Sequence, residues 1–219
     1  MKKILIFGCG EISDAISEII MFEKAFEIEG YVLNQKYISD KFFKTKKIYP
    51  IEEIENFFSP NDITFLTAVS YKNLNSNREN IYKNIKTKGY KFENFISKSA
   101  RLVNSKIGEN NIILENNNIQ NNVEIGNNNI FWSGNHVGHD TKIGNNNFIS
   151  TNVTISGAVN IGNNNFFGVS TTIRDNIEVG HSCVLGAGSI ILRNIQDNSV
   201  TSPKTTEISI ISSDKLKKI

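Results

Sequence analysis

Aliphatic residues recur every eighteen positions through the second half of the chain. One column, in which every member is followed by glycine, consists of Ile107, Ile125, Ile143, Ile161 and Val179. Two more columns, offset from the first by six and twelve residues, hold Ile113, Phe131, Ile149, Phe167 and Leu185, and Ile119, Val137, Ile155, Ile173 and Ile191. A hexapeptide unit that returns to the same column at every third repeat predicts three short parallel strands per coil, each with one apolar side chain facing the axis. We therefore expect an all-β parallel helix whose coils stack at the spacing of neighbouring strands, about 4.8 Å.

Asparagine and glycine cluster at one phase of this repeat. The sequence Gly-Asn-Asn-Asn occurs at residues 126–129, 144–147 and 162–165, in register with the aliphatic columns. These residue types adopt positive φ at low steric cost, which a sharp corner between strands requires. A bias in composition explains the abundance of asparagine but not its phase, so we interpret these segments as corners of the coil.

The composition limits the classes of protein to which the chain can belong. Its 219 residues carry a formal net charge of +2, which gives no support for a general nucleic-acid-binding or membrane-binding surface. The apolar run near the start ends at Phe7 and is followed by Glu11 and Asp14, which argues against a signal peptide and against a membrane span. Cys9 and Cys183 are too few and too far apart for a disulfide framework. We expect a cytoplasmic protein without membrane insertion and without nucleic acid as a partner.

The first part of the chain is typical of the opening of a βαβ unit. We expect a buried strand at residues 3–7, a tight turn at Gly8-Cys9-Gly10, a helix at 12–22 and a second strand at 26–33. In such a unit the helix N-terminus and bare backbone amides can hold a phosphate. Ser13 stands where a dinucleotide fingerprint has its third glycine, and Asn34 where it has an acidic residue, which argues against a redox NAD site. A purely structural cap is the alternative to a nucleotide-binding role.

Four segments accompany the repeats: the Gly8–Gly10 turn, residues 71–78, Lys88-Gly89-Tyr90, and residues 134–140. Together with the repeats they resemble, over nearly the whole chain, bacterial sugar acyltransferases that join a Rossmann-like domain to a left-handed β-helix. This group includes UDP-amino-sugar N-acetyltransferases of bacillosamine synthesis and sialic acid O-acetyltransferase-type proteins. The resemblance implies a left-handed coil, a homotrimer, acetyl-CoA as acyl donor and a nucleotide-linked amino sugar as acceptor. We expect residues 1–97 to form the Rossmann-like nucleotide-sugar-binding domain, residues 98–197 the left-handed β-helix acyltransferase domain, and residues 198–219 a C-terminal cap.

The same resemblance implies binding roles by position. In this group the glycine turn contacts the UDP of the nucleotide sugar. The matching substrate-binding candidates are Gly8, Cys9, Gly10, Glu11 and, at the end of the second strand, Asn34. Pantetheine lies between two neighbouring β-helices and bonds to backbone groups. The matching cofactor-binding candidates are Gly157, Val169 and Ala187, each of which could equally be a corner residue with no further role.

Two of the three histidines lie in one coil. Imidazole suits a general base near neutral pH, and a neighbouring carboxylate can fix its tautomer. In the enzymes that the chain resembles, the base is a histidine followed by an acid just ahead of an Ile-Gly corner, and His139-Asp140 precedes Ile143-Gly144 in this way. We expect His139 to be the catalytic base, Asp140 its orienting partner, and His136 a part of the acceptor pocket. The alternatives are His136 as the base, or two solvent-facing corner residues.

A metal site is a further alternative, because γ-class carbonic anhydrases bind zinc through histidines in the same kind of prism. His181 lies two coils and one face beyond His139, however, and cannot complete such a site within one chain. We expect no metal. The chain also departs from the acetyltransferase pattern, because Phe148 and Trp132 stand at positions that are usually polar. Because of these departures, the sequence does not decide the identity of the acceptor or of the acyl group.

The reaction that we expect is direct acyl transfer. His139 takes a proton from the sugar amine, the amine attacks the thioester, and a backbone amide at a corner of the rod stabilises the oxyanion. A sugar O-acetyltransferase would use the same residues and is the second interpretation. A carbonic-anhydrase-like metalloenzyme and a non-enzymatic solenoid are the remaining ones. The sequence does not indicate which sugar, which nucleotide or which acyl chain length is used.

Overall fold

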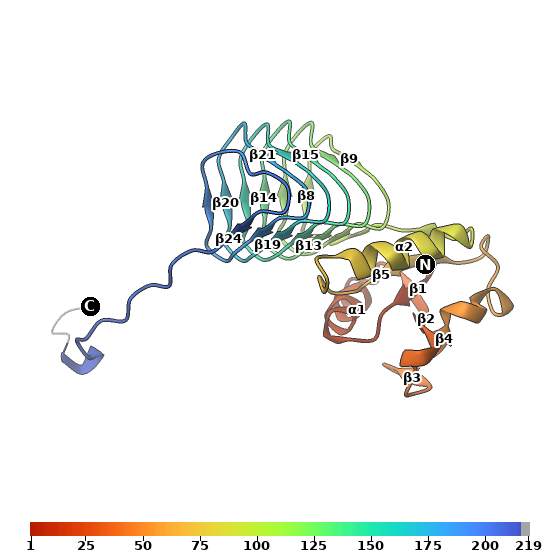
Figure 1. Cartoon of the computed structure of the whole chain (residues 1–219). Helices are drawn as coiled ribbons and strands as arrows, with labels where there is room; N and C mark the ends of the chain where they lie inside the picture. Colours follow the sequence, from red (N-terminus) through yellow and green to blue (C-terminus); the bar gives the residue numbers. More distant parts are fainter. Residues whose placement is uncertain (216–219) are drawn as a thin grey trace.

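The computed structural model describes residues 1–215, in which a sheet with flanking helices adjoins a rod of stacked coils (Figure 1). Beyond the far end of the rod the chain continues as an extended segment that ends in the short 3₁₀ helix η3 (Ser213–Lys215). None of the helices in these residues has the length and apolar character needed to cross a membrane.

The N-terminal sheet is built around a buried central strand. It contains β1 (Lys3–Phe7), β2 (Glu27–Leu33), β3 (Phe42–Phe43), β4 (Lys46–Pro50), β5 (Thr64–Thr67) and β6 (Lys91–Phe92), in the order β3-β4-β2-β1-β5-β6. The connections include α1 (Glu11–Glu23), α2 (Ser76–Thr87) and the 3₁₀ helices η1 (Gln35–Tyr37) and η2 (Ile51–Asn56). Strand pairs are parallel except β3 with β4. β1, α1 and β2 thus form the expected βαβ opening, and Ile4, Leu5 and Ile6 have no exposed surface because both faces of β1 are covered.

The rod has three faces, each a stack of two-residue parallel strands. Face 1 contains β7 (Phe95–Ile96), β10 (Ile112–Ile113), β13 (Ile130–Phe131), β16 (Phe148–Ile149), β19 (Phe166–Phe167), β22 (Val184–Leu185) and β24 (Val200–Thr201). Face 2 contains β8 (Arg101–Leu102), β11 (Asn118–Ile119), β14 (His136–Val137), β17 (Thr154–Ile155), β20 (Thr172–Ile173) and β23 (Ile190–Ile191). Face 3 contains β9 (Lys106–Ile107), β12 (Glu124–Ile125), β15 (Lys142–Ile143), β18 (Asn160–Ile161) and β21 (Glu178–Val179). These stacked parallel faces agree with the expected left-handed β-helix, and we name each edge of the rod by the two faces that it joins.

The aliphatic columns form the interior of the rod, as the repeat predicts. In face 1, Phe131 pairs in register with Ile113 below and Ile149 above, and all three side chains have no exposed surface. Each fully buried aliphatic or aromatic side chain of this kind contributes about 1.5–3 kcal/mol to the free energy of unfolding. No single coil could bury these residues, so the stacking of coils stabilises the rod.

Asparagine and glycine have different roles at edge 3–1. Asn128, Asn146 and Asn164 adopt the left-handed conformation, with φ of 59°, 60° and 60°. The preceding glycines permit close stacking instead, because a Cβ on Gly126 would lie 2.7 Å from the carbonyl oxygen of Gly144 in the next coil. The corner interpretation of the Gly-Asn-Asn-Asn segments is confirmed, and the asparagines supply the positive φ.

A buried arginine joins the sheet unit to the rod. Arg78 of α2 has no exposed surface, and its guanidinium donates to the carbonyl oxygens of Asn128, Asn146 and Asn147 and to Oδ1 of Asn75 at distances of 2.9–3.3 Å. Burial lowers the pKa of Arg78 to about 9, which still leaves it a cation at neutral pH. This side chain therefore fixes α2 against edge 3–1.

Candidate active site

A pocket of about 1220 Å³ lies between the N-terminal sheet unit and edge 1–2 of the rod. From the sheet unit it is lined by Gly8, Cys9, Gly10, Glu11, Asn34, Lys36, Ser70, Tyr71 and Lys72, among others. From the rod it is lined by Trp132, Phe148, Ser150, Thr151 and Val169. Five of the six candidate substrate-binding residues from the sequence thus line one pocket, together with one of the three cofactor candidates, whereas His136 is not among the lining residues.

The glycine turn at the floor of this pocket has a fixed shape. Gly8 has φ of 126°, and a Cβ there would lie 2.6 Å from the carbonyl oxygen of Ala68. The buried Ser13, at the position of the third glycine of a dinucleotide fingerprint, donates its hydroxyl hydrogen to the carbonyl oxygen of Gly8 at 2.7 Å. Gly10 caps α1 and has open space where a side chain would be. Gly10, Glu11 and Ile12, at the start of α1, line the pocket, and the first N–H groups of a helix have no acceptor within it.

Other residues of the turn are held by their surroundings. Burial raises the pKa of Cys9 to about 12, so the thiol stays protonated and is not a nucleophile. Asn34 donates from Nδ2 to Oε1 of Glu52 at 3.2 Å, which fixes its side chain at the rim. Glu11 lies in the first turn of α1 and is exposed.

Aromatic rings form the wall of the pocket on the rod side. The ring of Phe148 stacks on Phe166 at 5.7 Å, and Tyr71 contacts both, at 5.0 and 4.6 Å. Trp132 lies 6.5 Å from Phe148, measured between ring centroids. The two departures from the usual polar pattern therefore lie together and make this end of the pocket apolar.

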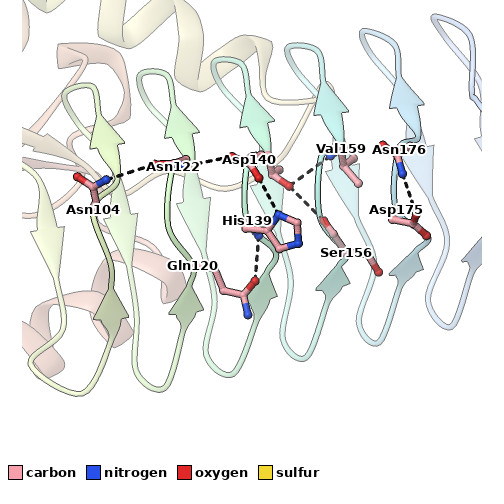
Figure 2. Close-up of polar contacts among 10 residues, drawn as sticks. Asn104, Gln120, Asn122, His139, Asp140, Ser156, Val159, Asp175 and Asn176 are labelled. Atoms are coloured by element: carbon pink, nitrogen blue, oxygen red, sulfur yellow. Dashed lines mark hydrogen bonds and ion pairs between the residues drawn. The ribbon is translucent and has the colours of Figure 1, made fainter.

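His139 and Asp140 lie on edge 2–3, between β14 and β15 (Figure 2). His139 Nδ1 is 2.7 Å from Asp140 Oδ2, and the backbone N–H of His139 donates to Oε1 of Gln120 at 2.9 Å. The hydrogen bond from His139, with a second from Asn122, lowers the pKa of the Asp140 carboxyl below its usual value. An ionised Asp140 accepts the Nδ1 hydrogen, which leaves the Nε2 lone pair of His139 free to take a proton.

Two features shape the surroundings of this imidazole. A Cβ on Gly157, in the next coil, would lie 2.7 Å from both Cε1 and Nε2 of His139, so the ring occupies the space that glycine leaves. The buried Thr141 donates to the carbonyl oxygen of Ser156 at 3.1 Å and accepts from the N–H of Val159 at 3.3 Å. These bonds fix the corner that carries the pair against the following coil.

The structure separates His139 from the glycine turn within one chain. His139 and Gly157 lie on edge 2–3, whereas the pocket opens at edge 1–2, where Val169 and Ala187 also lie. In residues 1–215 the backbone N–H groups of Gly157, Val169 and Ala187 make no hydrogen bond. All three cofactor candidates therefore offer open donors, but on two different edges.

The other histidines lie apart from this pair. His136 lies on face 2, with Nδ1 at 3.4 Å from Asn118 Nδ2. His181 lies on edge 3–1, where its Nδ1 accepts from the N–H of Asn163 at 2.9 Å. Within the part of the chain that the structure describes, no group of three His, Cys, Asp or Glu side chains is placed to hold a metal ion.

Sequence reasoning missed the sheet-unit residues that close the pocket, such as Ser70 and Lys72, and the burial of Arg78. One signal is present in the sequence, because residues 71–78 are among the four segments that carry the resemblance. Asn73, Leu74 and Asn75 in that segment all adopt positive φ, with values of 52°, 49° and 65°. A chain reversal just before α2 is thus what brings Arg78 against the rod.

Comparison with known proteins agrees with this architecture. The family described as bacterial transferase hexapeptide (six repeats) matches residues 125–157. No curated protein sequence matches the chain. Among solved structures, the acetyltransferase domain of PglB from Neisseria gonorrhoeae FA1090 is 21% identical with a TM-score of 0.80, covering 91% of this chain and 96% of that chain. The same domain has also been solved in complex with acetyl coenzyme A.

Two further structures are similar over the same extent. PerB from Caulobacter crescentus, in complex with CoA and GDP-perosamine, is 18% identical with a TM-score of 0.78, covering 91% of this chain and 93% of that chain. WeeI from Acinetobacter baumannii AYE is 12% identical with a TM-score of 0.80, covering 91% and 96%. The chain therefore carries bacterial transferase hexapeptide repeats and has the fold of these proteins over nine-tenths of its length.

Proposed function

We propose that this protein is an acetyl-CoA-dependent N-acyltransferase that acts on the amino group of a nucleotide-linked amino sugar, with His139 as general base. The observation that carries the proposal is the His139–Asp140 pair. Nδ1 of His139 is hydrogen-bonded to Oδ2 of Asp140 at 2.7 Å, so that Nε2, beside Gly157, is free to take a proton. Its fold is that of an acetyltransferase domain solved with acetyl coenzyme A and of PerB solved with CoA and GDP-perosamine. In this proposal residues 1–97 bind the nucleotide sugar and residues 98–197 carry the base. Because the donor is acetyl-CoA, we propose that the reaction takes place in the cytoplasm.

The proposed site is shared between two copies of the chain. The pocket at edge 1–2 and His139 at edge 2–3 lie on different edges of one rod. We propose a homotrimer in which edge 1–2 of one copy lies next to edge 2–3 of its neighbour. The sugar held by the glycine turn of one copy then meets His139 of the next, while pantetheine lies between Gly157 of one copy and Val169 and Ala187 of the other.

The proposed chemistry is a direct transfer. As the sugar amine attacks the thioester carbonyl carbon, Nε2 of His139 takes a proton from the nitrogen, and the CoA thiolate leaves. Asp140 stabilises the imidazolium that forms, and the open N–H of Gly157 donates to the oxyanion. General-base catalysis accelerates such a reaction by about 10²–10⁴-fold, and one hydrogen-bond donor to the oxyanion by about 10²–10³-fold. The partly buried thiol of Cys9 takes no part, because its pKa is raised to about 12.

The test is a steady-state assay of CoA thiol release with UDP-, dTDP- and GDP-linked sugars, each offered with an amine and with a hydroxyl at the same carbon. We expect turnover with at least one amino sugar and none with its hydroxy counterpart. Turnover with the hydroxy sugars alone would make the protein an O-acetyltransferase. Isothermal titration without acetyl-CoA binding would support a non-enzymatic solenoid, and stoichiometric zinc by elemental analysis would support a carbonic-anhydrase-like enzyme.

A further inference from the structure

A line of hydrogen bonds runs along edge 2–3 and ends at Asp140 (Figure 2). Asn104 Nδ2 donates to Asn122 Oδ1 at 3.2 Å, and Asn122 Nδ2 donates to Asp140 Oδ1 at 3.1 Å. The other carboxylate oxygen of Asp140, Oδ2, meets Nδ1 of His139 at 2.7 Å. Each oxygen of the carboxylate thus has its own donor.

The chemistry of the carboxylate sets the direction of this line. An ionised carboxylate can only accept hydrogen bonds, so the amide nitrogen of Asn122 must be the atom that faces Asp140. The amide oxygen of Asn122 then faces Asn104, which can only donate to it. The orientation of both asparagine amides follows from the charge at the end of the line.

Asn122 is the neighbour that can hold Asp140 in place. The side chains of His139 and Asp140 are 56% and 53% exposed, and an isolated exposed ion pair of this kind contributes little to holding its two side chains in one geometry. On the other side, the same position of the next coil is Ala158, which has no donor in its side chain. In residues 1–215 the carboxylate of Asp140 has hydrogen bonds with His139 and Asn122 alone.

We propose that Asn122 is a positioning residue that holds Asp140 in the rotamer in which Oδ2 accepts from His139 Nδ1, and so keeps the Nε2 lone pair of His139 available. Without Asn122, the half-exposed carboxylate turns toward water and the imidazole gains access to its other neutral tautomer, with the hydrogen on Nε2. That tautomer cannot take a proton at Nε2. The catalytic consequence rests on the proposed function, whereas the tautomer itself is a property of the protein without substrate.

The repeat provides a matched control. Asn122, Ala158 and Asn176 occupy the same position in their coils, with φ of 59°, 55° and 58°. Because Ala158 already adopts this conformation, we expect the corner to accept Asn122→Ala. Asn176 donates to Oδ2 of Asp175 at 2.7 Å and makes no hydrogen bond with His139 or Asp140. Asn176→Ala therefore removes an asparagine of the same kind without touching the pair.

The experiment is ¹⁵N NMR of the histidine rings in the full-length protein at about pH 9, where a free imidazole is neutral. The chain has three histidines, and the signals that disappear in His139→Gln identify the ring. We expect the wild type and Asn176→Ala to show the hydrogen on Nδ1 of His139, and Asn122→Ala to show a mixture of both tautomers. An unchanged His139 tautomer in Asn122→Ala, or an equal change in Asn176→Ala, would overturn the proposal.

Steady-state kinetics test the catalytic consequence of the proposed role of Asn122. We expect Asn122→Ala to lower kcat about tenfold, which corresponds to the loss of one hydrogen bond to a charged group. The KM for acetyl-CoA should stay unchanged. A change in tautomer with wild-type kcat would refute the positioning role in catalysis. If neither the wild type nor any variant transfers an acyl group although the tautomer shifts, the proposed function fails and the structural part of the inference stands.

Discussion

The substitution Gly157→Ala tests the geometry of the site most specifically. The added Cβ would lie 2.7 Å from Cε1 and Nε2 of His139, whereas ordinary contact begins at 3.4 Å, so the imidazole must move by about 0.7 Å. The ring is the end of a half-exposed side chain and can move, which means that the fold tolerates the change. A displacement of a catalytic group on the order of 1 Å can lower the rate about 10²-fold, and we expect kcat to fall by about that factor.

The measurement is kcat by CoA thiol release together with the melting temperature. Gly144→Ala is the control, because its Cβ would meet the carbonyl oxygen of Gly162 at 2.7 Å, and backbone cannot yield as a side chain can. We expect Gly157→Ala to lose activity with its melting temperature kept, and Gly144→Ala to melt at a lower temperature. Wild-type kcat in Gly157→Ala would refute the placement of His139 over this glycine.

Two further predictions follow from buried or charged groups. Arg78→Met leaves the buried carbonyl oxygens of Asn128 and Asn146 without their donor, and we expect urea denaturation to show a loss of about 3 kcal/mol in the free energy of unfolding. A loss below about 1 kcal/mol would contradict the role of Arg78 in joining the two parts. Because the hydrogen bonds from His139 and Asn122 lower the pKa of Asp140, this carboxyl stays ionised to a lower pH than a free aspartate. We therefore expect the ¹³C NMR signal of the Asp140 carboxyl to show ionisation down to a lower pH than in a free aspartate, and a carboxyl that takes up its proton at or above the usual pH would contradict this shift.

The interior of the rod could be predicted from the sequence because its rule is local. Each column residue repeats at a fixed spacing and packs on its own counterpart in the next coil, as Phe131 does on Ile113 and Ile149. The same spacing located the His139–Asp140 corner. No contact between distant parts of the chain had to be known.

The pocket and the interface could not be predicted in this way. In the sequence, Trp132 and Phe148 only depart from the usual polar residues of the acetyltransferase pattern. The fold shows that the two rings contact one another and that Phe148 also contacts Tyr71. Arg78 bonds mainly to backbone carbonyl oxygens, which every residue has, so no side-chain pattern marks its partners. The separation of the glycine turn from His139 within one chain likewise follows from the fold, because the turn faces edge 1–2 of the rod and His139 lies on edge 2–3.

The turnover of His139→Ala tests the central claim most directly. It is measured with acetyl-CoA and the best amino-sugar acceptor, alongside sedimentation to determine the oligomeric state. We expect turnover to fall by at least about 10²-fold while the protein remains a trimer, because the variant loses general-base help and keeps the rod. Turnover near that of the wild type, with the same oligomeric state, would contradict the assignment of His139 as the base.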